Sequence, residues 1–537
     1  MSSLTDQPYP FASKRHTVHA MHGMVATTQP LAAQAGLDML KQGGNAIDAA
    51  IATAAMLTVV EPTSNGIGGD AFALVYHQGK LHGLNGSGRA PNAIHIDAVK
   101  QRGFESMPTF GVVPITVPGA PAAWVSLSER FGKLPLKTVL APAVETARKG
   151  FPVSPTVAYY WQRAAKAYQK RDQKEIFKTW FDTFTVNGKA PSVGERFILT
   201  DHANTLEAIG ASHGEAFYRG HLAEAMTAYI KTHEGYLSKA DLATHASQWV
   251  EPVHTTYRDH TVWELPPNTQ GMITLEALNI IKHLPIEPKW DAQTLHHQIE
   301  ALKLAFADGL AHISDVEHMT TSVSALLDED YAKQRAALIG ENAQIPTAGK
   351  PPQGGTVYLA TADQDGNMVS FIQSNYMGFG SGIVIPNTGI AMQNRGHTFS
   401  LDENHVNALA PNKKTYHTII PGFLTRGDTP IGPFGVMGGF MQPQGHLQVL
   451  MNMLDFKLNP QAALDAPRWY WSEGNIIHIE KAMPREIVDA LKARSHTVRL
   501  TADAGPFGRG QIIWRDPQTH VLHGGTEMRA DGSIACY

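Results

Sequence analysis

The feature of this 537-residue chain that most constrains its fold is a threonine at the mouth of a predicted β-hairpin. Thr356 follows the pair Gly354-Gly355 and opens a β-prone run over 356–363. A polar Asp-Gly-Asn turn leads into a second β-prone run over 368–374, and two such runs around this turn predict a hairpin. The hydroxyl of Thr356 can attack the carbonyl of Gly355, because a residue without Cβ lets the backbone reach the strained geometry of an N-to-O acyl shift.

The product of such a shift is an ester that water opens, which leaves a new chain beginning at Thr356. The free α-amino group of that chain has a reference pKa of about 7.7–8.0, so it can take the hydroxyl proton without help from a histidine. These residues alone favour the simpler interpretation, in which Gly-Gly-Thr only starts an edge strand. The rest of the chain has to decide between the two.

The composition argues against several functional classes. A hydrophobic content of 43% suits a globular protein, and a net charge of −4 provides no basic field for nucleic acid or an acidic membrane. No run approaches the 18 apolar residues of a membrane span, and the single cysteine, Cys536, allows no internal disulfide. The first ten residues lack the basic start and apolar run of a secretory signal. We therefore expect a cytoplasmic protein with neither nucleic acid nor a membrane as a partner.

The order of predicted elements favours an α/β fold. We predict strands over 23–27, 71–76 and 80–84, helices over 31–42 and 46–60, a mainly helical region from about 100 to 345, and an exposed linker over 337–354. After the hairpin we predict strands over 383–385 and 418–423, a helix over 445–456, and an alternating pattern from 476 onward. Central strands with helices outside indicate a four-layer helix–sheet–sheet–helix arrangement, divided between residues 355 and 356.

Several spaced blocks of the sequence resemble those of one protein family. The N-terminal blocks are 23–32, 43–50, 60–62 and 66–69, and the C-terminal blocks are Thr356 with 365–367, 379–382, 399–400 and Pro421. In this order they are similar to the blocks of the γ-glutamyltransferase (γ-glutamyltranspeptidase) family of N-terminal nucleophile hydrolases. The resemblance covers nearly the whole chain, and it shifts the interpretation of Thr356 from strand residue to nucleophile.

The resemblance implies a four-layer αββα sandwich formed by two autoprocessed subunits, a large subunit of residues 1–355 and a small catalytic subunit of residues 356–537. It implies an enzyme that cleaves its own precursor at Gly355–Thr356. Such an enzyme transfers a γ-glutamyl-type acyl group from a small-molecule amide such as glutathione to water or an amine acceptor. The resemblance implies neither a metal nor an organic cofactor. A homo-oligomer of such two-subunit units is compatible with the sequence.

The catalytic roles of the family carry over to four positions. Thr356 corresponds to the processing and catalytic threonine, and Ser374 lies where the family has a hydroxyl that bonds the nucleophile. Gly438 and Gly439 match the paired glycines whose N–H groups stabilise the oxyanion. The alternative interpretations are an ordinary strand serine at 374 and a tight turn at the glycine pair.

The positions that bind the glutamyl α-carboxylate depart from the family pattern. The family uses an arginine and two adjacent serines. Here Ser87 stands at the arginine's place, and Arg89 lies two residues on, which along a strand returns to the same face. The serine pair is replaced by His417-Thr418.

The positions that bind the α-amino group also differ. Thr398 stands where the family has an aspartate, Arg395 lies in the same run, and Tyr376 replaces the usual asparagine, although Asn375 is adjacent. A carboxylate pairs strongly with an ammonium, whereas Thr398 offers only a neutral bond, and Arg395 repels an ammonium and attracts an anion. We therefore predict that glutathione is handled poorly and that an acyl group with a distal carboxylate is a better donor.

Two alternatives to a γ-glutamyltransferase remain open on the sequence. The first is an acylase that acts on cephalosporin-like, glutaryl-type or other N-acyl amides, and the substituted pocket residues favour it. The second is an uncleaved, non-enzymatic chain that binds a small acyl compound.

Three further motifs give little evidence of a functional site. The spacing His16-x-x-His19-x-x-His22 fits a strand, which separates the imidazoles, better than a metal site. The glycine loop over 65–69 follows a helix and has no lysine, so it is not a phosphate loop. His296-His297 is predicted to be a surface or packed pair on a helix.

Overall fold

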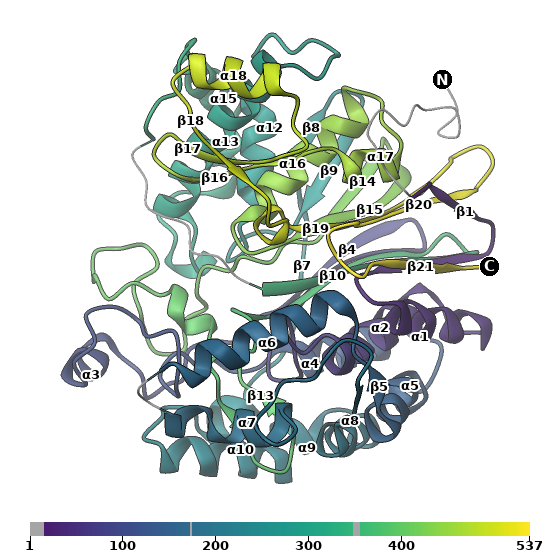
Figure 1. Cartoon of the computed structure of the whole chain (residues 1–537), viewed down its shortest axis with the longest axis vertical. Coiled ribbons are helices and arrows are strands. Elements are labelled where there is room, and N and C mark those ends of the chain that lie inside the picture. The colour runs from purple at the N-terminus through teal and green to yellow at the C-terminus, as the bar shows by residue number, and fades with distance from the viewer. Residues whose placement is uncertain (1–14, 172–173, 347–354) are drawn as a thin grey trace.

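The computed structural model describes residues 15–171, 174–346 and 355–537, and two seven-stranded antiparallel sheets lie at its centre (Figure 1). The strands of sheet 1, in spatial order, are β1 (Val18–Ala20), β20 (Leu522–Thr526), β19 (Arg509–Arg515), β15 (Thr429–Met437), β14 (Gly422–Arg426), β9 (His260–Glu264) and β8 (Val253–Tyr257). Those of sheet 2 are β21 (Ser533–Cys536), β2 (Gly23–Thr27), β10 (Gly355–Asp363), β11 (Met368–Tyr376), β3 (Asp70–His77), β4 (Lys80–Gly86) and β7 (Gln248–Val250).

The two sheets pack face to face through an apolar layer. Tyr358 and Ile372 of sheet 2 and Phe423 and Ile513 of sheet 1 belong to one cluster of fully buried side chains. Strands β10 and β11 contact β15 across this layer, and β10 also contacts β19. The apolar layer therefore fixes the start of β10, where Thr356 lies, against the strand that ends at Met437.

Helices cover the outer faces of both sheets (Figure 1). On sheet 2 they are α1 (Pro30–Lys41), α2 (Ala46–Val60) and α4 (Ala120–Phe131), with α5 (Leu136–Lys149) and α8 (Thr200–Ser212) packed beyond them. On sheet 1 they are α12 (Gly271–Ile281), α16 (Met441–Leu454) and α17 (Pro460–Asp465), with α13 (Ala292–His312) behind α12 and α16. The predicted α/β class is confirmed.

The remaining described elements surround this centre. A small sheet contains β16 (Trp469–Glu473), β17 (Ile476–Glu480) and β18 (Thr497–Thr501), and two short pairs are β5 (Phe151–Pro152) with β6 (Arg196–Phe197) and β12 (Val384–Ile385) with β13 (Ile390–Ala391). The other helices are α3 (Ile96–Gln101), α6 (Pro155–Gln169), α7 (Lys178–Phe184), α9 (Glu215–Tyr218), α10 (His221–Thr232), α11 (Lys239–Ala243), α14 (Val323–Leu326), α15 (Glu329–Ala336) and α18 (Arg485–Ala493).

Several local predictions are confirmed. The strand over 23–27 and the helix over 46–60 have the predicted bounds, and every residue of α2 is buried, as its continuous apolar sequence indicates. The predicted hairpin is the β10–β11 pair. His296 and His297 form a packed pair inside the protein. The described part of the predicted linker, 337–346, is mostly exposed, and 347–354 lies outside the described residues.

Other local predictions are incomplete or wrong. The region from about 100 to 345 is mainly helical, as predicted, but it also contains strands β7, β8 and β9, which lie toward the ends of the two large sheets. β8 carries threonine and histidine on its more exposed face, so its sequence lacks a strong apolar run. The strand predicted over 418–423 begins only at Gly422, and the helix predicted from 445 begins at Met441, close behind Gly439. The alternating C-terminal region also contains α18.

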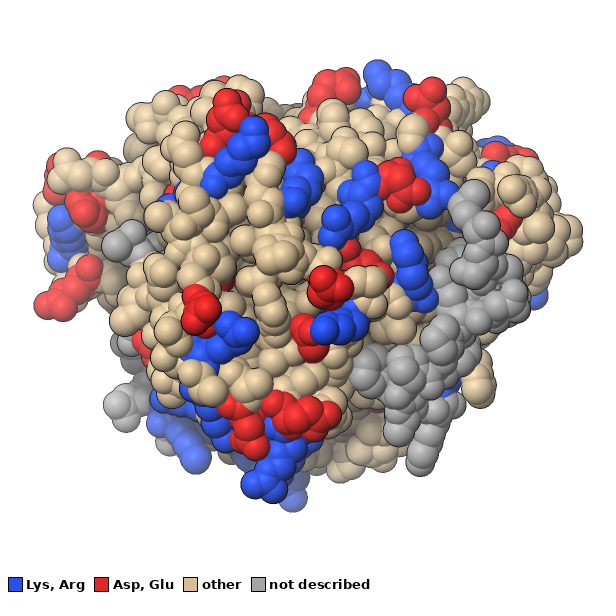
Figure 2. Space-filling model, turned by 90° about the horizontal axis from the view of Figure 1, so that it is seen from above, with Lys and Arg blue, Asp and Glu red and all other residues tan. Residues whose placement is uncertain are grey.

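The surface carries charges of both signs. Figure 2 shows a face on which acidic and basic side chains are interspersed, without a large patch of either sign.

Among the described residues, no helix combines the length and the apolar character that crossing a bilayer requires.

A buried charge network holds the small sheet to sheet 1. Glu527 accepts hydrogen bonds from Arg468 at 2.8 Å and Arg529 at 2.7 Å, and Arg529 also bonds Glu480 of β17 at 2.6 Å. Burial alone would raise the pKa of Glu527, but the charges of Arg468 and Arg529 outweigh it and hold this pKa at about 2. Removing one partner of such a network leaves buried charge unpaired.

We expect Glu527→Gln to lower the free energy of unfolding by about 3–5 kcal/mol at neutral pH. The folded-state pKa of Glu527 lies below its ordinary value of 4.5, so its stabilisation is complete above that pH and is lost as the pH falls toward 2. The difference between wild type and variant in urea unfolding should therefore shrink over this range. Glu145→Gln, which removes an exposed partner of Lys149, is the control and should change little. A constant difference from neutral pH to about pH 3 would contradict the assignment.

Candidate active site around Thr356

Thr356 lies at an irregular point of a central strand. Gly355 pairs with Tyr376 and Val357 pairs with Gln373, so the register between β10 and β11 shifts at Thr356. Such a bulge bends the strand and re-aims a side chain. Thr356 is only 1% exposed, and its Oγ1 lies 2.7 Å from the carbonyl oxygen of Gly355.

Ser374 is held against the same carbonyl. Its Oγ donates to Gly355 O at 2.6 Å, accepts the N–H of Tyr376 at 2.8 Å, and lies 3.3 Å from Thr356 Oγ1. Two hydroxyls therefore converge on the carbonyl of Gly355. A donor on a carbonyl oxygen polarises the carbonyl toward attack, and the Ser374 hydroxyl is such a donor next to the Thr356 hydroxyl.

The glycine pair lies where β15 passes into α16. Gly438 has φ +138° and Gly439 has φ +62°, a region that residues with a Cβ rarely adopt. Their carbonyls accept the N–H groups of Met441 and Gln442, the first residues of α16. Gly438 and Gly355 line the same cavity of 440 Å³, so the glycine pair begins at the cavity that the predicted cleavage point also borders.

The cavity beside Gly355 and Gly438 has a mixed lining. The aromatic residues Phe110, Tyr160, Tyr168 and Tyr470 line it, together with the basic and acidic side chains Arg163, Arg509 and Asp503. Its volume is in the range of small-molecule sites, and Gly355 is part of its wall.

Gln442 also contacts Thr356, although no sequence motif predicted this. Its Oε1 accepts the N–H of Ile420 at 2.9 Å, which leaves its Nε2 to donate to Thr356 Oγ1 at 3.4 Å. Because Ile420 N–H can only donate, the orientation of the Gln442 amide is determined. The only sequence feature that could have indicated this contact is the position of Gln442, three residues after the glycine pair.

Arg395, Tyr376 and Thr418, predicted from separate blocks, come together next to Ser374. The guanidinium carbon of Arg395 lies 4.2 Å from the centre of the Tyr376 ring, and its Nη1 donates to Thr418 Oγ1 at 2.8 Å. All three residues are fully buried. Tyr376 has φ +76°, which is unusual for an aromatic residue and typical of strained positions at functional sites.

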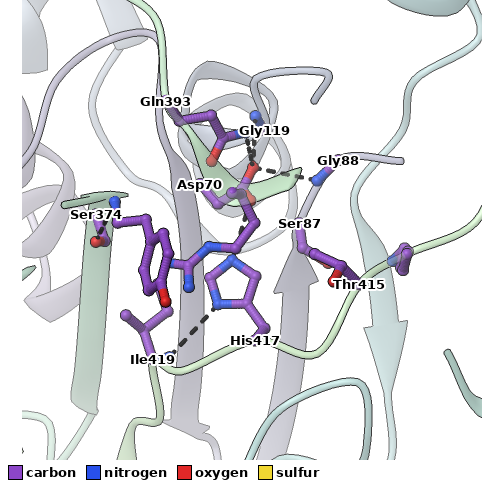
Figure 3. A network of polar contacts seen from close by, with 12 residues as sticks. Asp70, Ser87, Gly88, Gly119, Ser374, Gln393, Thr415, His417 and Ile419 are labelled. Atoms are coloured by element: carbon purple, nitrogen blue, oxygen red, sulfur yellow. Dashed lines mark hydrogen bonds and ion pairs between the residues drawn. The ribbon is translucent and has the colours of Figure 1, made fainter. Parts of the chain in front are cut away.

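Asp70, which the sequence analysis did not single out, is the centre of this polar network (Figure 3). Its Oδ1 accepts from the N–H groups of Gly88 and Gly119 at 3.1 Å and from Gln393 at 3.0 Å, and its Oδ2 accepts from His417 Nε2 at 3.0 Å. It follows directly on the glycine loop over 65–69 and begins β3. Two glycines of this loop, Gly66 and Gly69, allow the backbone to approach Asn375.

The protonation states of the network follow from its hydrogen bonds. His417 Nδ1 accepts the N–H of Ile419, so the proton is on Nε2, which donates to Asp70 (Figure 3). Burial, with the charges of Arg395 and Lys414, lowers the pKa of His417 well below its usual range, so this contact is a neutral hydrogen bond and not an ion pair. Burial raises the pKa of Asp70 to about 6, with Arg395 opposing, and burial lowers the pKa of Arg395 to about 10. Near neutral pH the pair is therefore Asp70 anion and Arg395 cation.

The other predicted binding residues make different contacts. Arg89 bonds Asp315 at 3.0 Å and the carbonyl of Asn412 at 2.9 Å. Ser87 donates to Asn85, and Thr398 donates to the carbonyl of Arg395 at 2.8 Å. The structure thus brings Arg395, Thr418, His417 and Tyr376 together near Ser374, whereas the Asn375 amide faces the glycine loop and Arg89 bonds Asp315 and Asn412.

Comparison with known proteins adds a second line of evidence. The sequence profile of the family described as Gamma-glutamyltranspeptidase matches residues 32–537. The protein belongs to the γ-glutamyltranspeptidase family. This finding confirms the resemblance drawn from the spaced sequence blocks, and the family includes proenzymes with hydrolase and transferase activity.

Relatives within the γ-glutamyltranspeptidase family carry several substrate names. The chain is 37% identical to the glutathione hydrolase-like YwrD proenzyme of Bacillus subtilis (strain 168), over 95% of this chain and 97% of the relative. It is 34% identical to the oxamate amidohydrolase proenzyme of Klebsiella pneumoniae subsp. pneumoniae, over 96% and 98%. Its structure matches that of a cephalosporin acylase from Bacillus halodurans with a TM-score of 0.96 and 58% identity, over 100% and 99% of the two chains. The family is therefore established, and the named substrates differ among its members.

We expect Gln442→Glu to lower kcat roughly 2- to 12-fold, because the variant keeps an acceptor for Ile420 N–H and loses the donor to Thr356, a hydrogen bond worth about 0.5–1.5 kcal/mol. Initial rates of amide hydrolysis, normalised to processed protein, measure this. Gln448→Glu is the matched control, because Gln448 is a buried glutamine of the same helix that bonds Gln444 and Trp469. It should lower the melting temperature without changing kcat. Equal kcat in wild type and Gln442→Glu would contradict a role for this contact.

Proposed function

We propose that this protein cleaves its own chain between Gly355 and Thr356 and then uses Thr356 to hydrolyse or transfer the acyl group of a small-molecule amide. The observation that carries the proposal is the convergence of the Thr356 and Ser374 hydroxyls on the Gly355 carbonyl, at 2.7 and 2.6 Å. The proenzyme names of the relatives support the same view.

In the processing step, Thr356 Oγ attacks the carbonyl carbon of Gly355. The C–N bond breaks, the nitrogen takes up the proton from the hydroxyl, and an ester joins Gly355 to Thr356 Oγ. Water then hydrolyses the ester, which releases a carboxyl group at Gly355 and restores the hydroxyl of Thr356. The products are a large subunit, 1–355, and a small subunit, 356–537.

The two subunits of this proposal would stay interleaved after cleavage. Sheet 2 takes β2, β3, β4 and β7 from the first segment and β10, β11 and β21 from the second, and sheet 1 also contains strands of both. Separating the subunits would break pairs such as β10 with β2 and β11 with β3. The proposed αββα sandwich is therefore one cooperative unit built from both products.

In the catalytic cycle, the new α-amino group of Thr356 takes the proton from Oγ as Oγ attacks the substrate carbonyl. The N–H groups of Gly438 and Gly439 stabilise the charge on the carbonyl oxygen. The amine product leaves with the proton, and water or an acceptor amine then takes the acyl group from Thr356. Ser374 and Gln442 hold the nucleophile in position, and no step requires a metal or an organic cofactor.

The pocket supports an acylase better than a γ-glutamyltransferase acting on glutathione. A γ-glutamyl group carries an ammonium, which requires an acceptor, preferably a carboxylate. Thr398, at the family's aspartate position, bonds Arg395 O and Thr415, and the carboxylate of Asp70 already accepts four hydrogen bonds. Arg395 places a positive charge in the same pocket. Glutathione hydrolysis remains the second candidate because a relative at 37% identity is named glutathione hydrolase-like.

We expect Thr356→Ala to remain one chain of 58.4 kDa, whereas wild type gives fragments of roughly 39 and 20 kDa on a denaturing gel. Intact mass should place the break between Gly355 and Thr356. Thr361→Val is the control, because Thr361 is a hydroxyl residue of the same strand that bonds the carbonyl of Ala46. This variant should still be processed. Wild-type protein that hydrolyses amides with an intact Gly355–Thr356 bond would overturn the proposal, and an unprocessed wild type without activity would favour a binding protein.

We expect kcat/KM for γ-glutamyl p-nitroanilide to be about 10- to 150-fold lower than for glutaryl p-nitroanilide, since a missing hydrogen bond to a charged group costs about 1.5–3 kcal/mol. The two substrates differ only by the ammonium group. Steady-state release of nitroaniline by processed wild type measures the ratio. A ratio near one, or a preference for the γ-glutamyl compound, would support the glutathione hydrolase alternative instead.

A further inference from the structure

A group of buried polar atoms next to Ser374 has no hydrogen-bond partner among the described residues. They are Nε and Nη2 of Arg395 and the hydroxyl of Tyr376. Both residues are 0% exposed. Buried polar groups in folded proteins are nearly always hydrogen-bonded, so several unpartnered groups in one place indicate a site that a ligand completes.

The unpartnered groups lie beside the reacting atoms. Asn375 and Tyr376 follow Ser374 in β11, and the Tyr376 N–H bonds the Ser374 hydroxyl at 2.8 Å. On the other side, Arg395 Nη1 donates to the side chain of Thr418. Gln270 Nε2 donates to the carbonyl of Thr418 and also, at 2.9 Å, to the carbonyl of Gly439. The group is therefore connected by short contacts both to the nucleophile and to the glycine pair.

The free edge of Arg395 has the geometry that binds a carboxylate. Its Nη1 is occupied by Thr418, and the face of the guanidinium lies on the Tyr376 ring. What remains is the edge formed by Nε and Nη2, two parallel N–H donors that match the two oxygens of a carboxylate. The Tyr376 hydroxyl is a further unpartnered group next to this guanidinium, whereas the Asn375 amide faces Gly66 and Gly69 of the glycine loop.

The charge of the pocket favours a planar monoanion. Asp70 lies near Arg395 and balances its charge, but no hydrogen bond joins the two in the described part of the chain, because the Asp70 oxygens accept from Gly88, Gly119, Gln393 and His417. His417 is neutral. Because the Asp70 anion already balances Arg395, a carboxylate adds one negative charge to this buried site and a phosphate dianion adds two, so the monoanion is the less costly ligand.

We propose that Arg395, with Tyr376, forms a subsite for a carboxylate on the acyl portion of the substrate, so that the preferred substrates are monoamides of short dicarboxylic acids. This inference rests on the proposed function of Thr356. The arginine of this subsite is Arg395, whereas transferring the family pattern along the sequence points to Arg89. Thr418 accepts a hydrogen bond from Arg395 Nη1, and the Tyr376 ring lies against the face of the guanidinium. Both therefore act as positioning residues for Arg395.

The experiment uses processed protein and pairs of p-nitroanilides that differ in one terminal group. Succinyl, glutaryl and adipyl anilides are compared with analogues in which a carboxamide replaces the terminal carboxylate. In wild type, kcat/KM for the best acid should exceed that of its carboxamide partner about 10- to 150-fold, as expected for a charge-assisted hydrogen bond. Because the carboxylate is bound in both the ground state and the transition state, the difference should appear mainly in KM.

Arg395→Gln should reduce this ratio to near one by lowering kcat/KM for the acids, with less than about a threefold change for the carboxamides. Arg395→Lys keeps the charge and loses the two-donor edge, so it should retain an intermediate ratio. Arg148→Gln, which removes an exposed arginine paired with Glu207, is the charge-matched control and should behave like wild type. Inhibition by free glutarate should be lost in Arg395→Gln and kept in Arg148→Gln.

The outcomes separate this inference from the proposed function. If wild type hydrolyses acids and carboxamides equally, or if Arg395→Gln and Arg395→Lys both keep the preference, the subsite is wrong while Thr356 catalysis stands. If Arg89→Gln abolishes the preference and the Arg395 variants do not, the carboxylate binds at Arg89 and the inference is overturned. If no anilide is hydrolysed and the chain stays unprocessed, the proposed function itself fails. Melting temperature and processing, measured for every variant, show that the variants are folded.

Discussion

The structure depends on how one backbone carbonyl, that of Gly355, is presented at the irregular start of a central strand. The pairing of β10 with β11 brings Ser374 opposite Thr356, although 18 residues separate them. The shift in register at Thr356 turns its hydroxyl back toward the preceding carbonyl. Packing between the two sheets then holds β10 against β15, which ends at the glycine pair. The placement of the nucleophile is thus a consequence of sheet register and inter-sheet packing.

The charges around this carbonyl are arranged at some cost in stability. Arg395 and Asp70 are fully buried, and burial shifts both pKa values toward the neutral forms. Taking two charges out of water is unfavourable unless hydrogen bonds satisfy them, and Asp70 is satisfied while half of the Arg395 guanidinium is not. This asymmetry distinguishes the Arg395 pocket from the Glu527 network, in which both arginines have carboxylate partners and the role is structural.

Members of the family share this fold but are named for different substrates. In this chain, the residues predicted to act in catalysis and those predicted to recognise the substrate come from different segments. Thr356, Ser374 and the glycine pair lie on strands of the two sheets or directly at their ends. Arg395, His417 and Thr418 lie in irregular segments between β13 and β14. Substitutions in these segments alter the pocket without moving the strands, which agrees with relatives at 34–37% identity that are named for different amides.

The sequence by itself determined several local elements and the family. The hairpin behind Thr356 and the buried helix α2 follow from residue patterns within short windows, and spaced family blocks predicted Thr356, Ser374, Gly438 and Gly439 as catalytic residues. Only the tertiary structure decided that Asp70 is the centre of the polar network, that Gln442 contacts Thr356, and that Arg395 rather than Arg89 lies beside Ser374. The physical reason is that these contacts join residues separated by 18 to 347 positions, and contact partners at such distances leave no periodic signal in the sequence. Strands β8 and β9 were missed for the same reason, since their place at a sheet edge is set by pairing with β14 and not by an apolar run of their own.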